Sequence, residues 1–317
     1  MARYCSIAYT AALEALRGYS KAMLAHVEPL RAEDGDAIHD MRVASRRLRA
    51  ALAEYGALFE KAAIKPFGAQ VRQVTRELSG ARELDVSISM LEKHRNALKG
   101  PARIAANYVL RRLRILRRKE SPKTTRCADW VASTEFNDLF QALLHSFGRR
   151  KQCQIKNAKR RVTKHFNNVV CIYTRWTETQ SEEDLHQLRI AFKKLRYTCE
   201  VYQKTYGQDM GAFISRLKQV QDWIGDWHDH FILQNFVKAF ARQAPPRSAT
   251  GMARLKRMLK QDGDALLADF TQGARAFFDP GARQTALDTF GALRHDCCWS
   301  KPSKSMKRPR EKVVPSG

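Results

Sequence analysis

The stretch His39-Asp-Met-Arg42-Val-Ala-Ser-Arg46-Arg47-Leu-Arg49 returns later in the chain as His186-Gln-Leu-Arg189-Ile-Ala-Phe-Lys193-Lys194-Leu-Arg196. Both copies open on histidine and carry cations at the same four places, at a constant offset of 147 residues, from 39 to 186 and from 49 to 196. A motif that recurs at a fixed offset indicates an internal repeat. The two copies therefore predict a fold built from two similar halves.

Both motifs have the spacing of an amphipathic helix. At about 100° per residue, the histidine and three of the cations of each copy fall within an arc of about 80°. Apolar residues gather on the opposite side: Met41, Ala44, Leu48, Leu52 and Tyr55 in the first copy, and Leu188, Ala191, Leu195, Cys199 and Tyr202 in the second. We expect helices at about 37–60 and about 183–206, each burying its apolar side and presenting a cationic stripe about 15 Å long.

The cationic stripes favour an anion-binding role over a merely solvated surface. Solvated helix faces usually mix charges of both signs, because like charges one turn apart destabilise a helix. Neither stripe contains a carboxylate. Arginine forms bidentate hydrogen bonds to phosphate oxygens, and histidine adds a charge that depends on pH. We therefore expect the affinity for a polyanion to rise as the pH falls from about 8 to about 6.

The composition indicates a folded protein with an anionic partner. Apolar residues make up 44% of the 317 residues, enough to bury a sizeable core. Fifty-seven Lys and Arg against 32 Asp and Glu give a formal net charge of +25. These positive side chains repel one another in the folded state unless an anion neutralises them. Nucleic acid, an anionic membrane and inorganic polyphosphate are the candidate partners.

The cysteines and the apolar runs indicate the cellular compartment in which the protein is expected. Seven cysteines without a Cys-x-x-Cys pair suggest neither a disulfide framework nor a zinc site. Glu14 and Arg17 interrupt the apolar pattern near the N-terminus, which makes it a poor signal peptide. No run approaches 18 uncharged apolar residues, so no membrane span is expected. The sequence predicts a soluble cytoplasmic protein that does not bind membranes.

Helical periodicity covers almost the whole chain, so the sequence predicts an all-α fold. Helices are expected at about 5–30, 37–60, 66–79, 83–98 and 102–119 in the first half, and at about 136–178, 183–206, 210–224, 228–243, 250–276 and 282–298 in the second. Gly80 and Gly225 are interpreted as helix C-caps. The predicted architecture is two tandem, pseudo-symmetric helical bundles of the four-helix type around a basic central cleft.

The domain boundaries follow from this division. Residues 1–120 are the first helical half, 121–135 a connector, and 136–299 the second helical half. Residues 300–317 carry three prolines and six Lys or Arg with few apolar residues. Because such a segment cannot bury enough surface to fold, it is expected to be a disordered basic tail.

The two motif strings resemble the signature helices of the CHAD domain, the conserved histidine α-helical domain. The resemblance extends over about 5–295, and the turns Gly80-Ala-Arg82-Glu83-Leu-Asp85 and Gly225-Asp-Trp-His228-Asp229 also resemble those after the third helix of each family half. The family prefers Asp at the position of Glu83 and a smaller polar residue at that of His228.

The resemblance implies two four-helix-type bundles around a basic cleft that binds inorganic polyphosphate, often with location on polyphosphate granules. The Glu-x-Glu-x-Lys signature of the triphosphate-tunnel domain, a frequent companion, is missing from this chain. Carried over by matching position, the polyphosphate-binding residues are His39, Arg42, Arg46, Arg47, Arg49, Arg82, His186, Arg189, Lys193, Lys194 and Arg196.

Other charged and aromatic segments have simpler interpretations. The segment from Asp222 to His230 could attract a divalent ion, but a helix end at Gly225 followed by an Asp N-cap is the preferred interpretation. Trp223 and Trp227 are expected to pack rather than to stack on bases. Glu54 and Glu200 are expected to orient neighbouring cations. Further basic patches, which extend the anion surface or are merely solvated, include Arg72, Arg76, Arg111, Arg112, Arg114, Arg117, Arg118, Lys119, Arg149, Arg150, Lys151, Lys156, Lys159, Arg160, Arg161 and Lys164.

Three functions remain open from the sequence. The first is non-catalytic binding of polyphosphate, which needs no base readout and no cofactor. The second is a metal-dependent phosphate-chain enzyme that uses His39 or His186, although the chain contains no Walker-type loop and the stripes no carboxylate cluster for Mg²⁺. The third is a general polyanion or nucleic-acid-binding protein, so that nucleic acid competes with polyphosphate. The sequence leaves the oligomeric state open.

Overall fold

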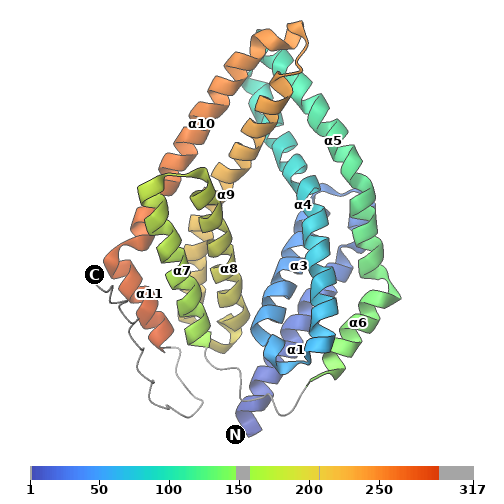
Figure 1. Cartoon of the computed structure of the whole chain (residues 1–317), viewed down its shortest axis with the longest axis vertical. Coiled ribbons are helices and arrows are strands. Elements are labelled where there is room, and N and C mark those ends of the chain that lie inside the picture. Colours follow the sequence, from blue (N-terminus) through green and yellow to red (C-terminus); the bar gives the residue numbers. More distant parts are fainter. Residues whose placement is uncertain (1, 148–157, 207, 293–317) are drawn as a thin grey trace, which may run out of the picture.

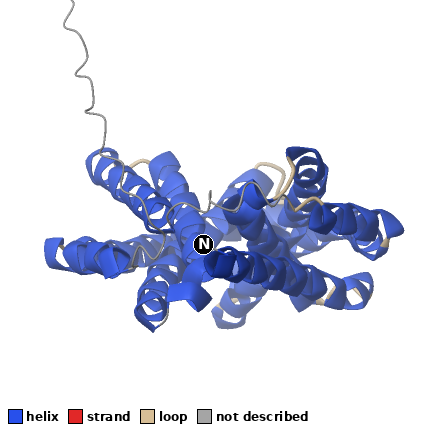
Figure 2. Cartoon of the chain, turned by 90° about the horizontal axis from the view of Figure 1, so that it is seen from below, coloured by secondary structure: helices blue, strands red, loops and turns tan. Residues whose placement is uncertain are grey.

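The computed structural model describes residues 2–147, 158–206 and 208–292, and within these ranges the chain is helical with no strand. The one bridge of β type among them joins Phe59 and Phe147. Figures 1 and 2 show the helices from two directions. The predicted all-α fold is confirmed. The expected basic tail, 300–317, and the basic residues Arg149, Arg150, Lys151 and Lys156 lie outside the described residues.

The helices follow a recurring order of lengths along the chain. The first series is α1 (Ala2–Ala25), α2 (Val27–Arg31), α3 (Gly35–Tyr55), the short 3₁₀ helix η1 (Gly56–Leu58), α4 (Lys61–Ala97), α5 (Gly100–Ala132) and α6 (Thr134–His145). The second is α7 (Ala158–Thr179), α8 (Glu182–Tyr206), α9 (Gln208–Ala241), α10 (Pro246–Phe278) and α11 (Pro280–Ala292). In each series the motif helix, α3 or α8, precedes two long α-helices and a short one, with η1 intervening after α3.

The helix bounds correct several of the predicted boundaries. Helix α4 passes through Gly80, and α9 passes through Gly225, so neither glycine is a C-cap. Helix α5 passes through Pro122 and ends at Ala132, so most of the predicted connector at 121–135 is helical. Conversely, the single helix expected at about 136–178 is interrupted, because α6 ends at His145 and α7 begins at Ala158.

Packing explains why a glycine can stand within α4. A Cβ on Gly80 would lie 3.1 Å from a carboxylate oxygen of Glu120 on α5. The missing side chain thus leaves room for the Glu120 carboxylate of α5 beside α4, although glycine within a helix costs about 1 kcal/mol. The same local signal that predicts a helix end therefore marks a close helix contact.

Two hydrophobic clusters hold the molecule together. The larger one includes Leu48 of α3, Leu195 of α8 and Phe270 of α10, so it draws on both halves of the chain. The smaller one lies where the long helices meet, with Leu91 of α4, Val109 of α5, Val237 of α9 and Leu255 of α10. In Figure 1 the four long helices converge at one end, while α3 and α8 stand next to each other below them. This arrangement fixes the two motif helices relative to one another.

The motif helices bury the predicted apolar sides. All ten apolar residues of the two faces, among them Met41 and Leu48 in the first copy and Leu188 and Leu195 in the second, are buried. The cationic stripes therefore point away from the core. Among the described helices, none combines the length and apolar character that crossing a membrane requires.

Candidate functional site

Helices α3 and α8 are joined directly by polar contacts. The Nε of Arg47 donates to Glu200 over 3.2 Å, and the Tyr55 hydroxyl donates to the carbonyl oxygen of Val201 over 3.3 Å. The Tyr202 hydroxyl donates to the buried Glu54 carboxylate over 2.8 Å. These contacts join the C-terminal parts of α3 and α8. The motif cations belong to the same two helices.

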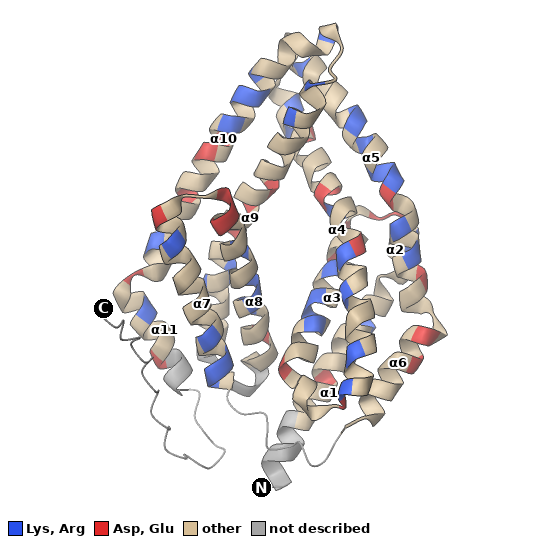
Figure 3. Ribbon diagram, in the orientation of Figure 1, with Lys and Arg blue, Asp and Glu red and all other residues tan. Residues whose placement is uncertain are grey.

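Seven cations form what we call the cation cluster: Arg42, Arg46 and Arg49 of α3, Arg72 and Arg76 of α4, and Arg189 and Lys193 of α8. Burial, and then the charges of neighbouring cations, lower the pKa of Arg42, Arg49, Arg189 and Lys193, and Arg46 is among these neighbours for all four. Figure 3 shows Lys and Arg along α3 and α8 where the helices face each other. Cations from both motif copies thus meet at one place.

Burial makes this concentration of positive charge costly. Burial, followed by the charges of Arg189 and Arg46, lowers the pKa of Lys193 to about 6. Burial and the charge of Arg46 lower the pKa of Arg42 to about 10. A cation that is withdrawn from water and surrounded by like charges favours its neutral form, and both pKa shifts have this direction. An anion bound among these side chains would reverse them.

Most of the cluster has no carboxylate partner. Arg189 lies 3.7 Å from Asp229 of α9. Within the described ranges, no carboxylate lies within ion-pairing distance of the other cations, which are Arg42, Arg46, Arg49, Arg72, Arg76 and Lys193. Glu83 of α4 lies nearby, where burial raises its pKa and the charges of Arg42 and Arg189 lower it. The cluster therefore keeps a large positive excess.

Arg42 is held in place from α4. Its Nη1 donates to the carbonyl oxygen of Thr75 over 2.9 Å and also to the hydroxyl of Ser79. Thr75 and Ser79 are one turn apart, so one face of α4 fixes the guanidinium. Arg46, by contrast, makes no hydrogen bond within the described ranges. The cluster thus combines a positioned arginine with cations that are available to a ligand.

The histidines of the two motifs lie in different surroundings. His39 is exposed, and partial burial followed by the charge of Arg82 lowers its pKa. The ring of His186 lies 5.3 Å from that of His228 on α9. Burial, then Arg189 and His186, lowers the pKa of His228 to about 3. His39 and Arg82 thus share one location, and His186 and His228 share another next to Arg189.

Besides His39, Arg82 and His186, three more predicted binding residues lie outside the cluster. Arg47 and Arg196 flank Glu200, at 3.2 and 3.6 Å, so their charge is partly neutralised. Lys194 is exposed on the side of α7, where its charge contributes to lowering the pKa of His165. Pairing of Glu200 with Arg47, and of Glu54 with Arg161 at 2.9 Å, agrees with the expected orienting role of these carboxylates.

Sequence reasoning gave little weight to Arg72 and Arg76. Their i, i+4 spacing on α4 was visible, yet only tertiary packing brings them beside Arg49. The segment from Asp222 to His230 lies inside α9, so the interpretation of a helix end followed by an Asp N-cap is wrong. Among the described residues, no group of three or more His, Cys, Asp or Glu is arranged to hold a metal ion. Trp227 is buried, and Trp223 packs against Gly273 of α10, as expected for packing residues.

Comparison with known families matches the CHAD domain model to residues 14–238. The chain belongs to the CHAD domain family. The match contains both motif helices and the paired long helices α4, α5 and most of α9. The resemblance of the two histidine motifs to this family is thereby confirmed.

Solved structures support the CHAD fold. The chain is similar to PptA from Streptomyces chartreusis, with a TM-score of 0.64 and 16% identity over 84% of this chain and 99% of that one. It is also similar to the CHAD domain from the plant Ricinus communis, with a TM-score of 0.59 and 19% identity over 90% of this chain and 92% of that one. At such low identity the likeness shows the fold alone. A comparison with curated proteins found no match.

Proposed function

We propose that this CHAD protein binds inorganic polyphosphate without catalysis, through the cation cluster. One observation carries the proposal. Arg46 and Lys193, from equivalent positions of the two motifs, lie together in a partly buried place without a carboxylate partner among the described residues. Burying like charges side by side is unfavourable unless an anion joins them. A polyanion supplies the missing charge along the whole stripe.

A uniform phosphate chain suits this arrangement. The cations come from three helices, α3, α4 and α8, and follow stripes about 15 Å long, so they can meet several consecutive phosphates. Arginine contributes five of the six members without a carboxylate partner, and its planar fork matches phosphate oxygens. A flexible inorganic chain requires no base readout, so charge and spacing suffice for recognition.

The decisive experiment compares two double variants that each remove two basic side chains. Arg46→Ala with Lys193→Ala removes two members of the cluster, whereas Arg111→Ala with Arg254→Ala removes two exposed cations of α5 and α10. Titration with polyphosphate of defined length should show at least a tenfold loss of affinity for the first variant and less than a twofold loss for the second. Equal losses would mean that net charge, not the cluster, binds the chain.

Two further assays separate the alternative functions. If duplex DNA or RNA displaces polyphosphate at equal phosphate concentration, the protein is a general polyanion binder. If polyphosphate shortens or releases phosphate during incubation with the purified protein and Mg²⁺ or Mn²⁺, the protein is an enzyme. We expect neither result.

The proposal extends to location. Family membership and the cation cluster together lead us to propose that the protein associates with polyphosphate granules. A fluorescent fusion should follow the granules, and the variant with Arg46→Ala and Lys193→Ala should lose this pattern. Retention of that variant on granules would assign targeting to another part of the chain.

A further inference from the structure

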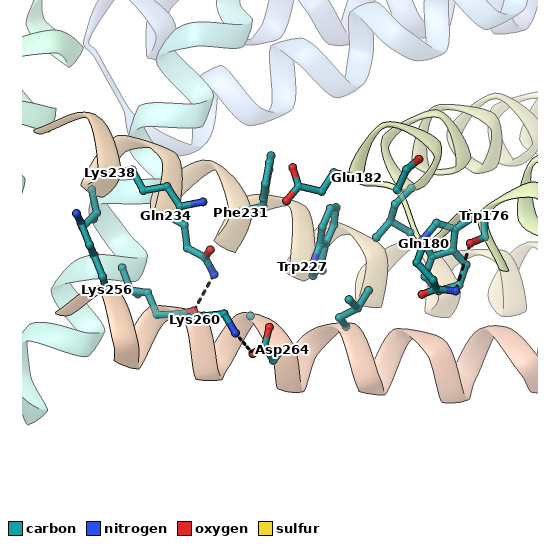
Figure 4. A pocket seen from close by; sticks show the side chains of 16 residues that line it. Trp176, Gln180, Glu182, Trp227, Phe231, Gln234, Lys238, Lys256, Lys260 and Asp264 are labelled. Atoms are coloured by element: carbon teal, nitrogen blue, oxygen red, sulfur yellow. Dashed lines mark hydrogen bonds and ion pairs between the residues drawn. The ribbon is translucent and has the colours of Figure 1, made fainter. Parts of the chain in front are cut away.

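A second candidate site is a pocket of about 430 Å³ between α9 and α10, closed at one end by the last turn of α7 and the start of α8. None of the seven cluster cations lines it. Its volume lies within the range of small-ligand sites, about 300–1,000 Å³. Figure 4 shows that lysines occupy one end and Trp176 and Gln180 the other, with Trp227 and Phe231 between them.

The middle of the pocket is aromatic. The rings of Trp227 and Phe231, one turn apart on α9, are stacked with centroids 5.4 Å apart and an interplanar angle of 15°. Trp227 is 8% exposed, so most of it packs in the core while its remaining surface faces the pocket. Buried Leu185 and Leu259 complete the lining. The aromatic and aliphatic side chains of this lining can pack against a flat aromatic ring of a ligand.

The polar groups beside the aromatic wall are hydrogen-bond acceptors. The side-chain nitrogen of Gln234 donates to the carbonyl oxygen of Leu259 over 2.8 Å, which leaves its amide oxygen available. Gln180 likewise uses its amide nitrogen on the Trp176 carbonyl oxygen, at 3.2 Å. Glu182 contributes a carboxylate without an ion-pair partner in the described part of the chain. These acceptors suit the N–H edge of an aromatic heterocycle.

A glycine on α10 preserves the position of Gln234. A Cβ on Gly263 would lie 2.5 Å from the side-chain nitrogen of Gln234, so any larger residue would displace that amide. Leu259, which accepts the hydrogen bond, and Gly263 both belong to α10, so one face of α10 holds the amide. The acceptor at the pocket wall is therefore positioned by packing rather than by chance.

The opposite end of the pocket is cationic. Lys238 of α9 and Lys256 and Lys260 of α10 line it together. Lys260 pairs with Asp264 at 3.1 Å. Lys238 and Lys256 have no carboxylate within ion-pairing distance among the described residues. Two available ammonium groups at one end suit an anionic substituent such as a phosphate.

We propose that this pocket binds a purine nucleotide, with its base against Trp227 and Phe231 and its phosphates on Lys238 and Lys256. Guanine fits the acceptor edge best, because its adjacent ring and exocyclic N–H groups can both donate to the carboxylate of Glu182. The site is separate from the cation cluster, and its occupation does not depend on the proposed binding of polyphosphate.

GDP is the probe for the first test, with guanosine and pyrophosphate as its two halves. Calorimetric titration of the full chain should show saturable GDP binding at least tenfold tighter than that of either half. Lys238→Ala with Lys256→Ala, two exposed positions, should weaken GDP binding at least tenfold. Glu182→Gln should weaken GDP binding more than that of inosine diphosphate, which lacks the exocyclic amine.

The matched control is the cluster variant with Arg46→Ala and Lys193→Ala. It should bind GDP within threefold of the unmodified protein, even where it no longer binds polyphosphate. Three results would overturn the proposal: no saturable GDP binding up to millimolar concentration, pyrophosphate binding as tightly as GDP, or loss of GDP binding in the cluster variant. The last would show that GDP is only a weak ligand of the cation cluster.

Discussion

Replacing Lys193 with Met is expected to abolish most of the proton uptake that accompanies polyphosphate binding. In the free protein, burial and the neighbouring arginines lower the pKa of Lys193 to about 6. At pH 7.5 only about 3% of this side chain is then protonated. A phosphate chain in contact with the ammonium restores its charge, so binding takes up close to one proton, roughly 0.9.

The sign and size of the pH dependence follow from this linkage. Because the bound form holds one more proton, the affinity falls as the pH rises above the pKa of free Lys193. Between pH 6.5 and pH 8 the protonated fraction drops about 20-fold, which sets the largest loss of affinity expected from this residue. The pKa of His39 is lowered from its ordinary value, so this histidine contributes mainly toward the acidic end of the range.

Calorimetric titration at pH 7.5 in two buffers with different ionisation enthalpies measures the protons taken up. Long polyphosphate keeps the contribution of its end groups small, and the difference between protein variants cancels the remainder. Lys194→Met is the matched control, because Lys194 is adjacent in sequence but exposed toward α7. The reasoning fails if the unmodified protein takes up fewer than about 0.3 protons, or if the Lys193→Met variant takes up as many.

Three further predictions test other contacts. A plot of the logarithm of the polyphosphate affinity against the logarithm of the salt concentration should have a slope of about −4 for the six cluster cations without a carboxylate partner, at about −0.7 for each. A flat plot would argue against ionic binding. Asp229→Asn releases Arg189 from its 3.7 Å contact. This substitution should raise the affinity for polyphosphate roughly threefold to tenfold, about 1 kcal/mol. An unchanged affinity in the same titration would mean that Arg189 does not contact the ligand. Glu54→Ala leaves Arg161 and Tyr202 without their shared carboxylate and should lower the free energy of unfolding by about 3 kcal/mol. Chemical denaturation measures this change, and a loss under about 1 kcal/mol would show that the buried carboxylate adds little.

The motif helices show how far the sequence determines this fold. Period-3.6 spacing alone identified α3 and α8, their buried apolar sides and the residues of both cationic stripes, because helix geometry is local. The sequence also shows directly the repeat at constant offset and the excess of Lys and Arg. They predict an all-α protein with an anionic partner.

Helix ends were less well determined. Gly80, Gly225 and Pro122 act as local stop signals, yet α4, α9 and α5 continue through them. The cost of these residues is about 1 to 3 kcal/mol each. The packing of the long helices against one another decides where these helices end, and the partners lie well outside the local sequence, as Glu120 does for Gly80.

Only the tertiary structure shows which cations of a motif are paired with a carboxylate and which are not. Arg46 and Arg47 are neighbours in one motif, but Arg47 pairs with Glu200, while the charge of Arg46 helps to lower the pKa of the buried Lys193. The lowered pKa of Lys193 has the same origin, since burial and opposing charges arise between helices. The sequence by itself determined which residues carry positive charge and on which side of a helix; the tertiary structure decided which charges are neutralised, because electrostatic energy depends on distance and burial rather than on chain position.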